Sequence, residues 1–214
     1  MVTKKRILIT AGSTWIKLDK VRVISNIASG KTGLILATRL KNIGVKVTLL
    51  LGPGDFSASR IPGVKIINFK YFSELERLLN SELKKQKYSA VIHAAAVADY
   101  KPKEMIRQKV SSRLNKWKIS LVPTKKLVNS LKKYGPGLIA VGFKFEPGAV
   151  KSRLIEKAKQ LLKEANLDIV VANSSKNKSY QAYMLDAQNK LGPFLSKAKM
   201  TVSLSNILKG KLRL

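Results

Sequence analysis

The chain has 214 residues, 45% of them hydrophobic, which is enough to bury the core of a single domain spanning residues 1–214. Its 42 lysines and arginines against 12 acids give a formal net charge of +30, and the lack of cysteine excludes disulfides, thiolate metal sites and a cysteine nucleophile. No apolar run is long enough to span a membrane and the first ten residues lack the apolar segment of a signal peptide, so we expect a cytoplasmic protein without membrane partners.

Short apolar runs alternate with helical patterns along the first half of the chain. The runs that predict buried strands are 6–10, 45–51, 64–69 and 90–95. Apolar residues spaced three or four apart predict helices over 31–42 and 72–83. Strands that alternate with helices are typical of a parallel sheet, so the expected fold class is α/β. We expect a Rossmann-like, doubly wound, mostly parallel sheet with helices on both faces.

The second half continues this alternation in a less regular way. Apolar runs predict strands over 117–122, 137–145 and 167–173, and a late edge strand over 181–187. Helical spacing predicts helices over 124–134 and 149–165 and a short last helix over 200–209. We therefore expect a C-terminal part that is less regular than the N-terminal half.

The first connection is longer than a Rossmann fold requires. About twenty residues separate Thr10 from the helix that starts near Gly30, whereas such connections usually take about two to six. An NAD fingerprint of three glycines would directly follow the first strand, where "TAGSTW" supplies one glycine. None of the six tyrosines is followed four residues later by lysine, so an NAD(P)-dependent short-chain oxidoreductase is a weak alternative.

The long connection ends in "SNIASGKTG" (25–33), which contains the Gly-Lys-Thr of a phosphate-binding P-loop. The first glycine of that signature is replaced by Ser25, and no later strand offers an obvious acid for the metal. A helix N-terminus at Ser29 and Gly30 would nevertheless present backbone N–H groups to phosphate without P-loop topology. A helix start with a solvated Lys31 is the plain alternative.

The positive charge points to an anionic ligand without naming it. Residues 101–133 are strongly basic, with eleven lysines and arginines and one acid, Glu104. They contain no aromatic RNA-binding motif and no basic helix with heptads, so a functional role for nucleic acid is not expected. A basic nucleic-acid-binding protein stays as an alternative, and a lysine-rich bias on solvated faces would explain the same charge.

Four segments, in chain order, resemble phosphopantothenate–cysteine ligases. They are "ILITAGSTWIKLDKVRVISNIASGKTG" from Ile7, "AAAVADYKP" (94–102), "QKVSSRLNKWKISLVPTKKLV" (108–128), and "VGFKFE" followed by "ANLDIVVAN". The matches run from residue 7 to about 173, which is most of the chain. The chain is therefore similar to the ligase portion of a decarboxylase/ligase protein of coenzyme A synthesis.

This resemblance implies a ligase that joins 4′-phosphopantothenate to cysteine. Its co-substrate would be CTP or ATP with Mg²⁺, and its intermediate an acyl-CMP or acyl-AMP. The family is usually homodimeric, and in many organisms it is fused to a flavin-dependent decarboxylase. We therefore expect a homodimer and a separate phosphopantothenoylcysteine decarboxylase as a partner.

The resemblance also implies roles for individual residues. Arg22 and Asn26 would be catalytic and hold the phosphopantothenoyl group, with Asn26 beside the acyl intermediate. The residues implied in nucleotide binding are Gly12, Ser29, Gly30, Ala95, Asp99, Lys109, Phe143 and Lys163. Turn formation, solvated charge, helix capping and core packing are the alternatives for these residues, and the metal ligands stay open.

Some positions depart from the family pattern. Ser13 replaces the second glycine of Gly-Gly-Thr, and two lysines of CTP-using members would fall on Leu161 and Ala165. Lys159 and Lys163 have the same spacing nearby, whereas "VGFKFE" and "KVSS" resemble ATP-using members. The choice of nucleotide therefore stays open. The single histidine, His93, lies in an apolar strand and is expected to be structural.

Overall fold

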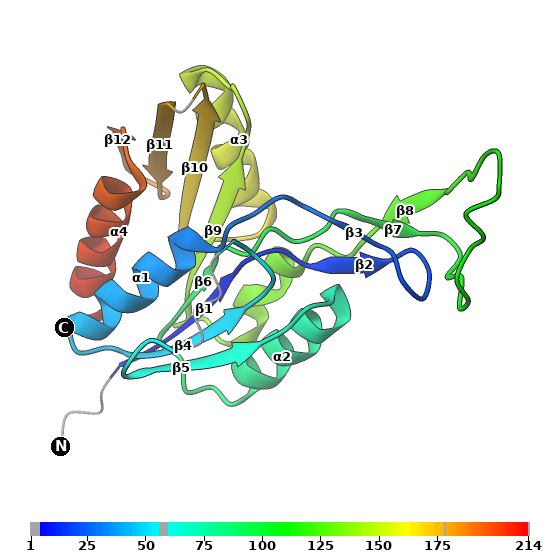
Figure 1. Cartoon of the computed structure of the whole chain (residues 1–214). Coiled ribbons are helices and arrows are strands. Elements are labelled where there is room, and N and C mark those ends of the chain that lie inside the picture. The colour runs from blue at the N-terminus through cyan, green and yellow to red at the C-terminus, as the bar shows by residue number, and fades with distance from the viewer. Residues whose placement is uncertain (1–4, 56–59, 178, 214) are drawn as a thin grey trace.

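A computed structural model describes residues 5–55, 60–177 and 179–213. Its centre is an eight-stranded sheet with the order β12-β11-β10-β9-β6-β1-β4-β5 (Figure 1). The parallel strands are β1 (Arg6–Ala11), β4 (Lys46–Leu51), β5 (Val64–Asn68), β6 (Ala90–His93), β9 (Ile139–Phe145) and β10 (Ile169–Lys176). Two antiparallel strands, β11 (Ser179–Leu185) and β12 (Lys190–Phe194), complete one side.

Helices cover both faces of this sheet and bury its apolar runs. One face packs against α1 (Lys31–Asn42) and α4 (Lys197–Leu212). The other packs against α2 (Phe72–Lys84), the 3₁₀ helix η1 (Leu127–Tyr134) and α3 (Lys151–Glu164). Strands covered on both faces need continuous apolar sequence, as "ILI" of β1 shows with every side chain fully buried. The expected doubly wound α/β fold is confirmed.

Two short antiparallel pairs extend away from the main sheet. β2 (Trp15–Lys17) pairs with β3 (Val23–Ser25), and residues 15–25 are here called the ribbon. β7 (Tyr100–Pro102) pairs with β8 (Leu121–Pro123), and residues 100–123 are called the arm. Ribbon and arm project together on one side of the molecule, at the right in Figure 1. The long first connection thus contains a hairpin that the sequence pattern did not reveal.

Several expected elements differ from the structure. The strand expected over 117–122 is reduced to Leu121–Pro123, because only these residues face β7. The helix expected over 124–134 is the shorter 3₁₀ helix η1. The strand over 181–187 is not an edge strand, since β12 lies outside it. β12 contains Gly192 and Pro193, which are rare inside strands, so the sequence pattern did not predict it. Proline has no N–H to donate to a neighbouring strand, which is compatible with a position at the edge of the sheet.

His93 is a structural histidine, as expected. It lies buried at the end of β6, and its Nδ1 is 2.9 Å from Thr10 Oγ1 on the adjacent β1. Burial lowers the pKa of the imidazole from its usual 6.5 to about 4, because the charged form is poorly solvated. The ring is therefore neutral near pH 7 and holds β6 against β1.

This buried imidazole predicts a pH dependence of stability. The unfolded chain binds a proton near pH 6.5 whereas the folded chain does not until about pH 4, so stability falls as pH decreases between these values. Urea unfolding should show a free energy of unfolding about 1 kcal/mol lower at pH 5.5 than at pH 7. His93→Gln should remove most of this difference. Equal stability of the unaltered chain at both pH values would contradict a buried neutral imidazole.

In the described part of the chain, no helix has both the length and the apolar character that crossing a membrane requires.

Candidate active site at the carboxyl edge of the sheet

Two glycines form the floor of the site, where β1 ends and α1 begins. Gly12 has φ +81° and Gly30 has φ +75°, a region that side chains disfavour. A Cβ on Gly12 would lie 2.4 Å from the carbonyl oxygen of Gly52, and a Cβ on Gly30 would lie 3.4 Å from the Gly12 nitrogen. Glycine at both positions lets the two turns pack backbone to backbone.

The loop after β4 closes the same floor, and sequence reasoning did not identify it. A Cβ on Gly52 would lie 2.3 Å from the Ser13 carbonyl oxygen, and a Cβ on Gly54 would lie 2.6 Å from that of Ser29. The backbone N–H of Ser13 also donates to the Pro53 carbonyl at 2.7 Å. The only signal in the sequence was a Gly-Pro-Gly turn directly after a buried strand.

The segment after β6 runs alongside this floor. Ala96 N–H donates to the Gly12 carbonyl at 2.8 Å, and Ala98 N–H donates to Thr14 Oγ1 at 2.9 Å. Ala95 N–H donates to Thr10 Oγ1 at 3.2 Å. These bonds continue the β1–β6 pairing beyond the sheet, so Ala95 lies beside the end of β1.

Asn26 directly follows the ribbon and contacts the segment after β6. Its Nδ2 donates to the Val97 carbonyl at 3.0 Å. Three residues later, Ser29 Oγ accepts the N–H of Lys31, the first residue of α1, at 3.3 Å. The exposed Asn26 amide therefore contacts the "AAAVAD" segment five residues before α1 begins.

Arg22 is held by Asp19, a residue that sequence reasoning passed over within the matched "IKLDKVR". Arg22 Nη1 donates to Asp19 Oδ2 at 2.7 Å and to the Val110 carbonyl at 3.2 Å. Burial by itself would raise the pKa of the Asp19 carboxyl. The N–H groups of Val21, Val110 and Arg22, together with the Arg22 charge, outweigh it and lower that pKa to about 2. Asp19 is therefore an ionised, buried carboxylate.

Asp99 directly precedes the arm, and Lys109 lies within it. β6 ends at His93, two residues earlier than the strand expected over 90–95, and Asp99 follows six residues later at the base of the arm. Its side chain is 57% exposed and forms an ion pair with Lys126. Lys109 is exposed and precedes Val110, whose backbone Asp19 and Arg22 bind. Asp99 therefore lies at the base of the arm, and Lys109 lies next to the peptide that Asp19 and Arg22 bind.

The remaining two candidates differ in position. Phe143 lies near the carboxyl end of β9, half-buried against the core beneath α1 and α4. Lys163 is exposed in the last turn of α3, shortly before β10 begins. Because α3 returns the chain to the amino end of the parallel strands, Lys163 lies at the opposite edge of the sheet. Within one chain, the structure does not bring Lys163 to the other candidates.

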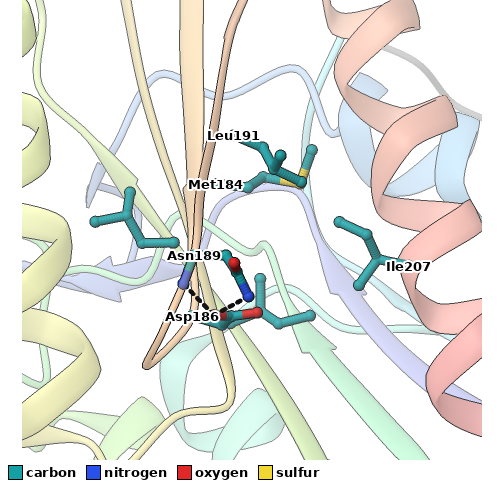
Figure 2. A pocket seen from close by; sticks show the side chains of 7 residues that line it. Met184, Asp186, Asn189, Leu191 and Ile207 are labelled. Atoms are coloured by element: carbon teal, nitrogen blue, oxygen red, sulfur yellow. Dashed lines mark hydrogen bonds between the residues drawn. The ribbon is translucent and has the colours of Figure 1, made fainter.

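A small pocket lies at that opposite edge and has a different character. Figure 2 shows it between the β11–β12 turn and α4, with Met184, Leu191 and Ile207 as apolar walls. Its acid, Asp186, accepts the backbone N–H groups of Gln188 at 2.9 Å and Asn189 at 2.7 Å. Asp186 is therefore engaged in forming its own turn, and the pocket contains none of the candidate residues.

The comparison with known families decides the assignment. The model of the family described as "DNA/pantothenate metabolism flavoprotein C-terminal domain" matches residues 2–211. The chain belongs to this family. The resemblance to phosphopantothenate–cysteine ligases is thereby confirmed, and the oxidoreductase alternative loses its support.

Individual members agree with this family. The coenzyme A biosynthesis bifunctional protein CoaBC of Thermococcus kodakarensis is 36% identical over 80% of this chain and 42% of its own length. That of Borreliella burgdorferi is 34% identical over 95% of this chain and 52% of its own length. The chain thus spans about half the length of these relatives. A solved C-terminal domain of CoaBC superposes with a TM-score of 0.79 and 26% identity, covering 98% of this chain and 96% of that domain.

Proposed function

We propose that this chain joins 4′-phosphopantothenate to cysteine with CTP or ATP, through an acyl-CMP or acyl-AMP intermediate. The observation that carries the proposal is the meeting of separate matched segments at one edge of the sheet. Gly12 and Asn26 of the first segment bond to Ala96 and Val97 of the second, and Gly30 lies against Gly12. Carboxyl edges of parallel sheets are where ligands bind in such folds.

In this proposal the glycine floor and the start of α1 bind phosphate. Attack of a carboxylate on a triphosphate gathers several negative charges, so catalysis depends on positioning and on charge neutralisation. Backbone N–H groups near Gly12 and Gly30, together with the positive end of the α1 dipole, would neutralise part of this phosphate charge. Lys109 supplies a cation from the arm, and Ala95 lines the nucleotide.

Magnesium would arrive with the nucleotide. No group of three or more histidine, aspartate or glutamate side chains suited to a metal occurs within residues 5–55, 60–177 and 179–213. Mg²⁺ commonly needs only one or two carboxylates beside substrate phosphates and water. In this proposal a single carboxylate, that of Asp99, is therefore enough. When bound, the ion would neutralise phosphate charge, and Asp99 would contact either the ion or the ribose.

Asn26 and Arg22 would hold the phosphopantothenoyl part of the acyl-nucleotide. Asn26 already donates one N–H to Val97, and its amide is neutral, so it can donate to an acyl oxygen without forming an ion pair. Arg22 uses Nη1 for Asp19 and Val110, and in this proposal its Nε and Nη2 donors hold the phosphopantothenoyl phosphate.

Two partners are part of the proposal. Apolar side chains are exposed on the ribbon, on the arm and in the loop that follows the ribbon, namely Val21, Ile27, Met105, Leu114 and Leu121. A second copy of the chain would cover them in a homodimer. The matched relatives are bifunctional and about twice as long, so a separate phosphopantothenoylcysteine decarboxylase would supply the other activity.

Pyrophosphate release tests the function directly. The protein is mixed with 4′-phosphopantothenate, cysteine, Mg²⁺ and either CTP or ATP, and pyrophosphate and the amide product are measured. We expect release that requires phosphopantothenate and is faster with one of the nucleotides. Reactions lacking phosphopantothenate serve as the control for simple nucleotide hydrolysis. No release with either nucleotide would remove the ligase proposal.

A further inference from the structure

Asp19 makes more contacts than its turn requires. Its Oδ1 accepts the backbone N–H groups of Val21 at 2.8 Å and Arg22 at 2.7 Å, which is sufficient to form the turn between β2 and β3. Its Oδ2 accepts Arg22 Nη1 at 2.7 Å and the backbone N–H of Val110 at 3.1 Å, 91 residues away. The Asp19 side chain is fully buried although Lys20 and Val21 beside it are exposed.

These contacts fix one point of the arm. Asp19 accepts the N–H of Val110 while Arg22 donates to its C=O, so both peptide groups of Val110 are held. Trp117 lies against the same arginine, with its ring centre 5.2 Å from Arg22 Cζ. Within residues 103–120, Val110 and Trp117 are the two positions that are not exposed. The Asp19–Arg22 pair is therefore the anchor of this otherwise exposed stretch.

We propose that Asp19 is a positioning residue, which acts through Lys109 and Arg22 by holding Val110; this rests on the ligase function proposed above. Lys109 is adjacent to the held peptide, so the anchor limits where its ammonium group can lie. A cation that is already in place loses less conformational entropy when the nucleotide binds. Asp19 also orients the Arg22 guanidinium. One carboxylate would thus position both Lys109, which is proposed to contact the nucleotide, and Arg22, which is proposed to contact the phosphopantothenoyl group.

Asp19→Asn separates the turn from the anchor. The asparagine Oδ1 can still accept from Val21 and Arg22, but an NH₂ group replaces Oδ2 and faces the N–H donors of Val110 and Arg22. We expect the KM for the nucleotide to rise by roughly tenfold to a hundredfold. Amide hydrogen exchange should become faster at Val110, a readout that does not require activity.

Asp186→Asn is the matched control. Asp186 also accepts two backbone N–H groups in a tight turn, but it lies at the opposite edge of the sheet. It should leave the nucleotide KM and exchange at Val110 unchanged. Equal effects of the two substitutions would mean that Asp19 contributes only general stability, which overturns the proposal.

A double-mutant cycle shows whether Asp19 acts through Lys109. Lys109→Gln alone should raise the nucleotide KM, and adding Asp19→Asn should raise it little further, because residues acting as one unit are not additive. Fully additive effects on this KM would overturn the proposed route through Lys109. If the unaltered protein makes no amide with either nucleotide, the ligase function itself fails, and unchanged exchange at Val110 in Asp19→Asn would separately disprove the anchor.

If Asp19→Asn does not fold, Val110→Pro tests the same contact from the side of the arm. Proline removes the single N–H that Asp19 Oδ2 accepts from the arm, and leaves Asp19 and the core untouched. It should reproduce the rise in nucleotide KM with little change in melting temperature. A normal KM in Val110→Pro would overturn the proposal.

Discussion

Asn26→Asp is expected to block amide formation while pyrophosphate release continues. Asn26 Nδ2 donates to the Val97 carbonyl at 3.0 Å, and an aspartate would place a carboxylate against that oxygen instead. It would also face the acyl-nucleotide with a negative charge and without a donor. Loss of a hydrogen bond made in the transition state typically lowers the rate by about 10²–10³. The rate of cysteine attack on the acyl-nucleotide should fall more than the rate of acyl-nucleotide formation, because this attack develops charge on the acyl oxygen.

Mass spectrometry of the quenched reaction measures this outcome. We expect a bound acyl-nucleotide and little phosphopantothenoylcysteine. Lys31→Ala is the comparison, since Lys31 would be the critical residue if "SNIASGKTG" acted as a P-loop. Amide formation at the normal rate in Asn26→Asp, together with loss of triphosphate use in Lys31→Ala, would replace our interpretation of this loop.

Gly12→Ala is expected to produce the largest loss of stability. Its backbone has φ +81°, which costs about 1–2 kcal/mol for a residue with a side chain. The new Cβ would also lie 2.4 Å from the Gly52 carbonyl oxygen and 2.9 Å from that of Pro53, so backbone must shift. Forced shifts of this kind cost typically about 1–3 kcal/mol more. The free energy of urea unfolding should therefore fall by about 2–5 kcal/mol, with loss of nucleotide binding.

Gly44→Ala provides a control for the conformational part of this cost. Gly44 has φ +90°, but nothing lies within 4 Å of the Cβ position, and the residue is in the turn after α1. This substitution should cost only about 1–2 kcal/mol and leave nucleotide binding intact. If both substitutions cost the same, the turns after β1 and β4 do not pack as the structure shows.

Much of the candidate site follows from patterns within short stretches of sequence. Ile7, Leu8 and Ile9 form a continuous apolar run shortly before Gly12, which predicts a strand buried on both faces. The Ser29-Gly30-Lys31 sequence, followed by regularly spaced apolar residues, predicts a helix start. A parallel sheet then places the end of such a strand and the start of such a helix at one edge. The structure agrees for Gly12, Ser29 and Gly30.

Contacts between distant loops were not visible in these patterns. The alternation that would reveal β2, β3 and β7 spans only three residues each, which is too short to distinguish from a loop. The role of Asp19 depends on Val110, which is 91 residues away in sequence. Such a contact depends on which loops the fold brings side by side.

The sequence by itself determined the α/β class, the alternation of strands and helices, and the helix start after Gly30, because these depend on side-chain patterns within a few residues. Only the tertiary structure decided that Gly52 and Gly54 close the floor, that Asp19 anchors the arm, and that Lys163 lies at the far edge. Strand order and loop packing set these positions, and they arise from contacts between segments that no local pattern connects.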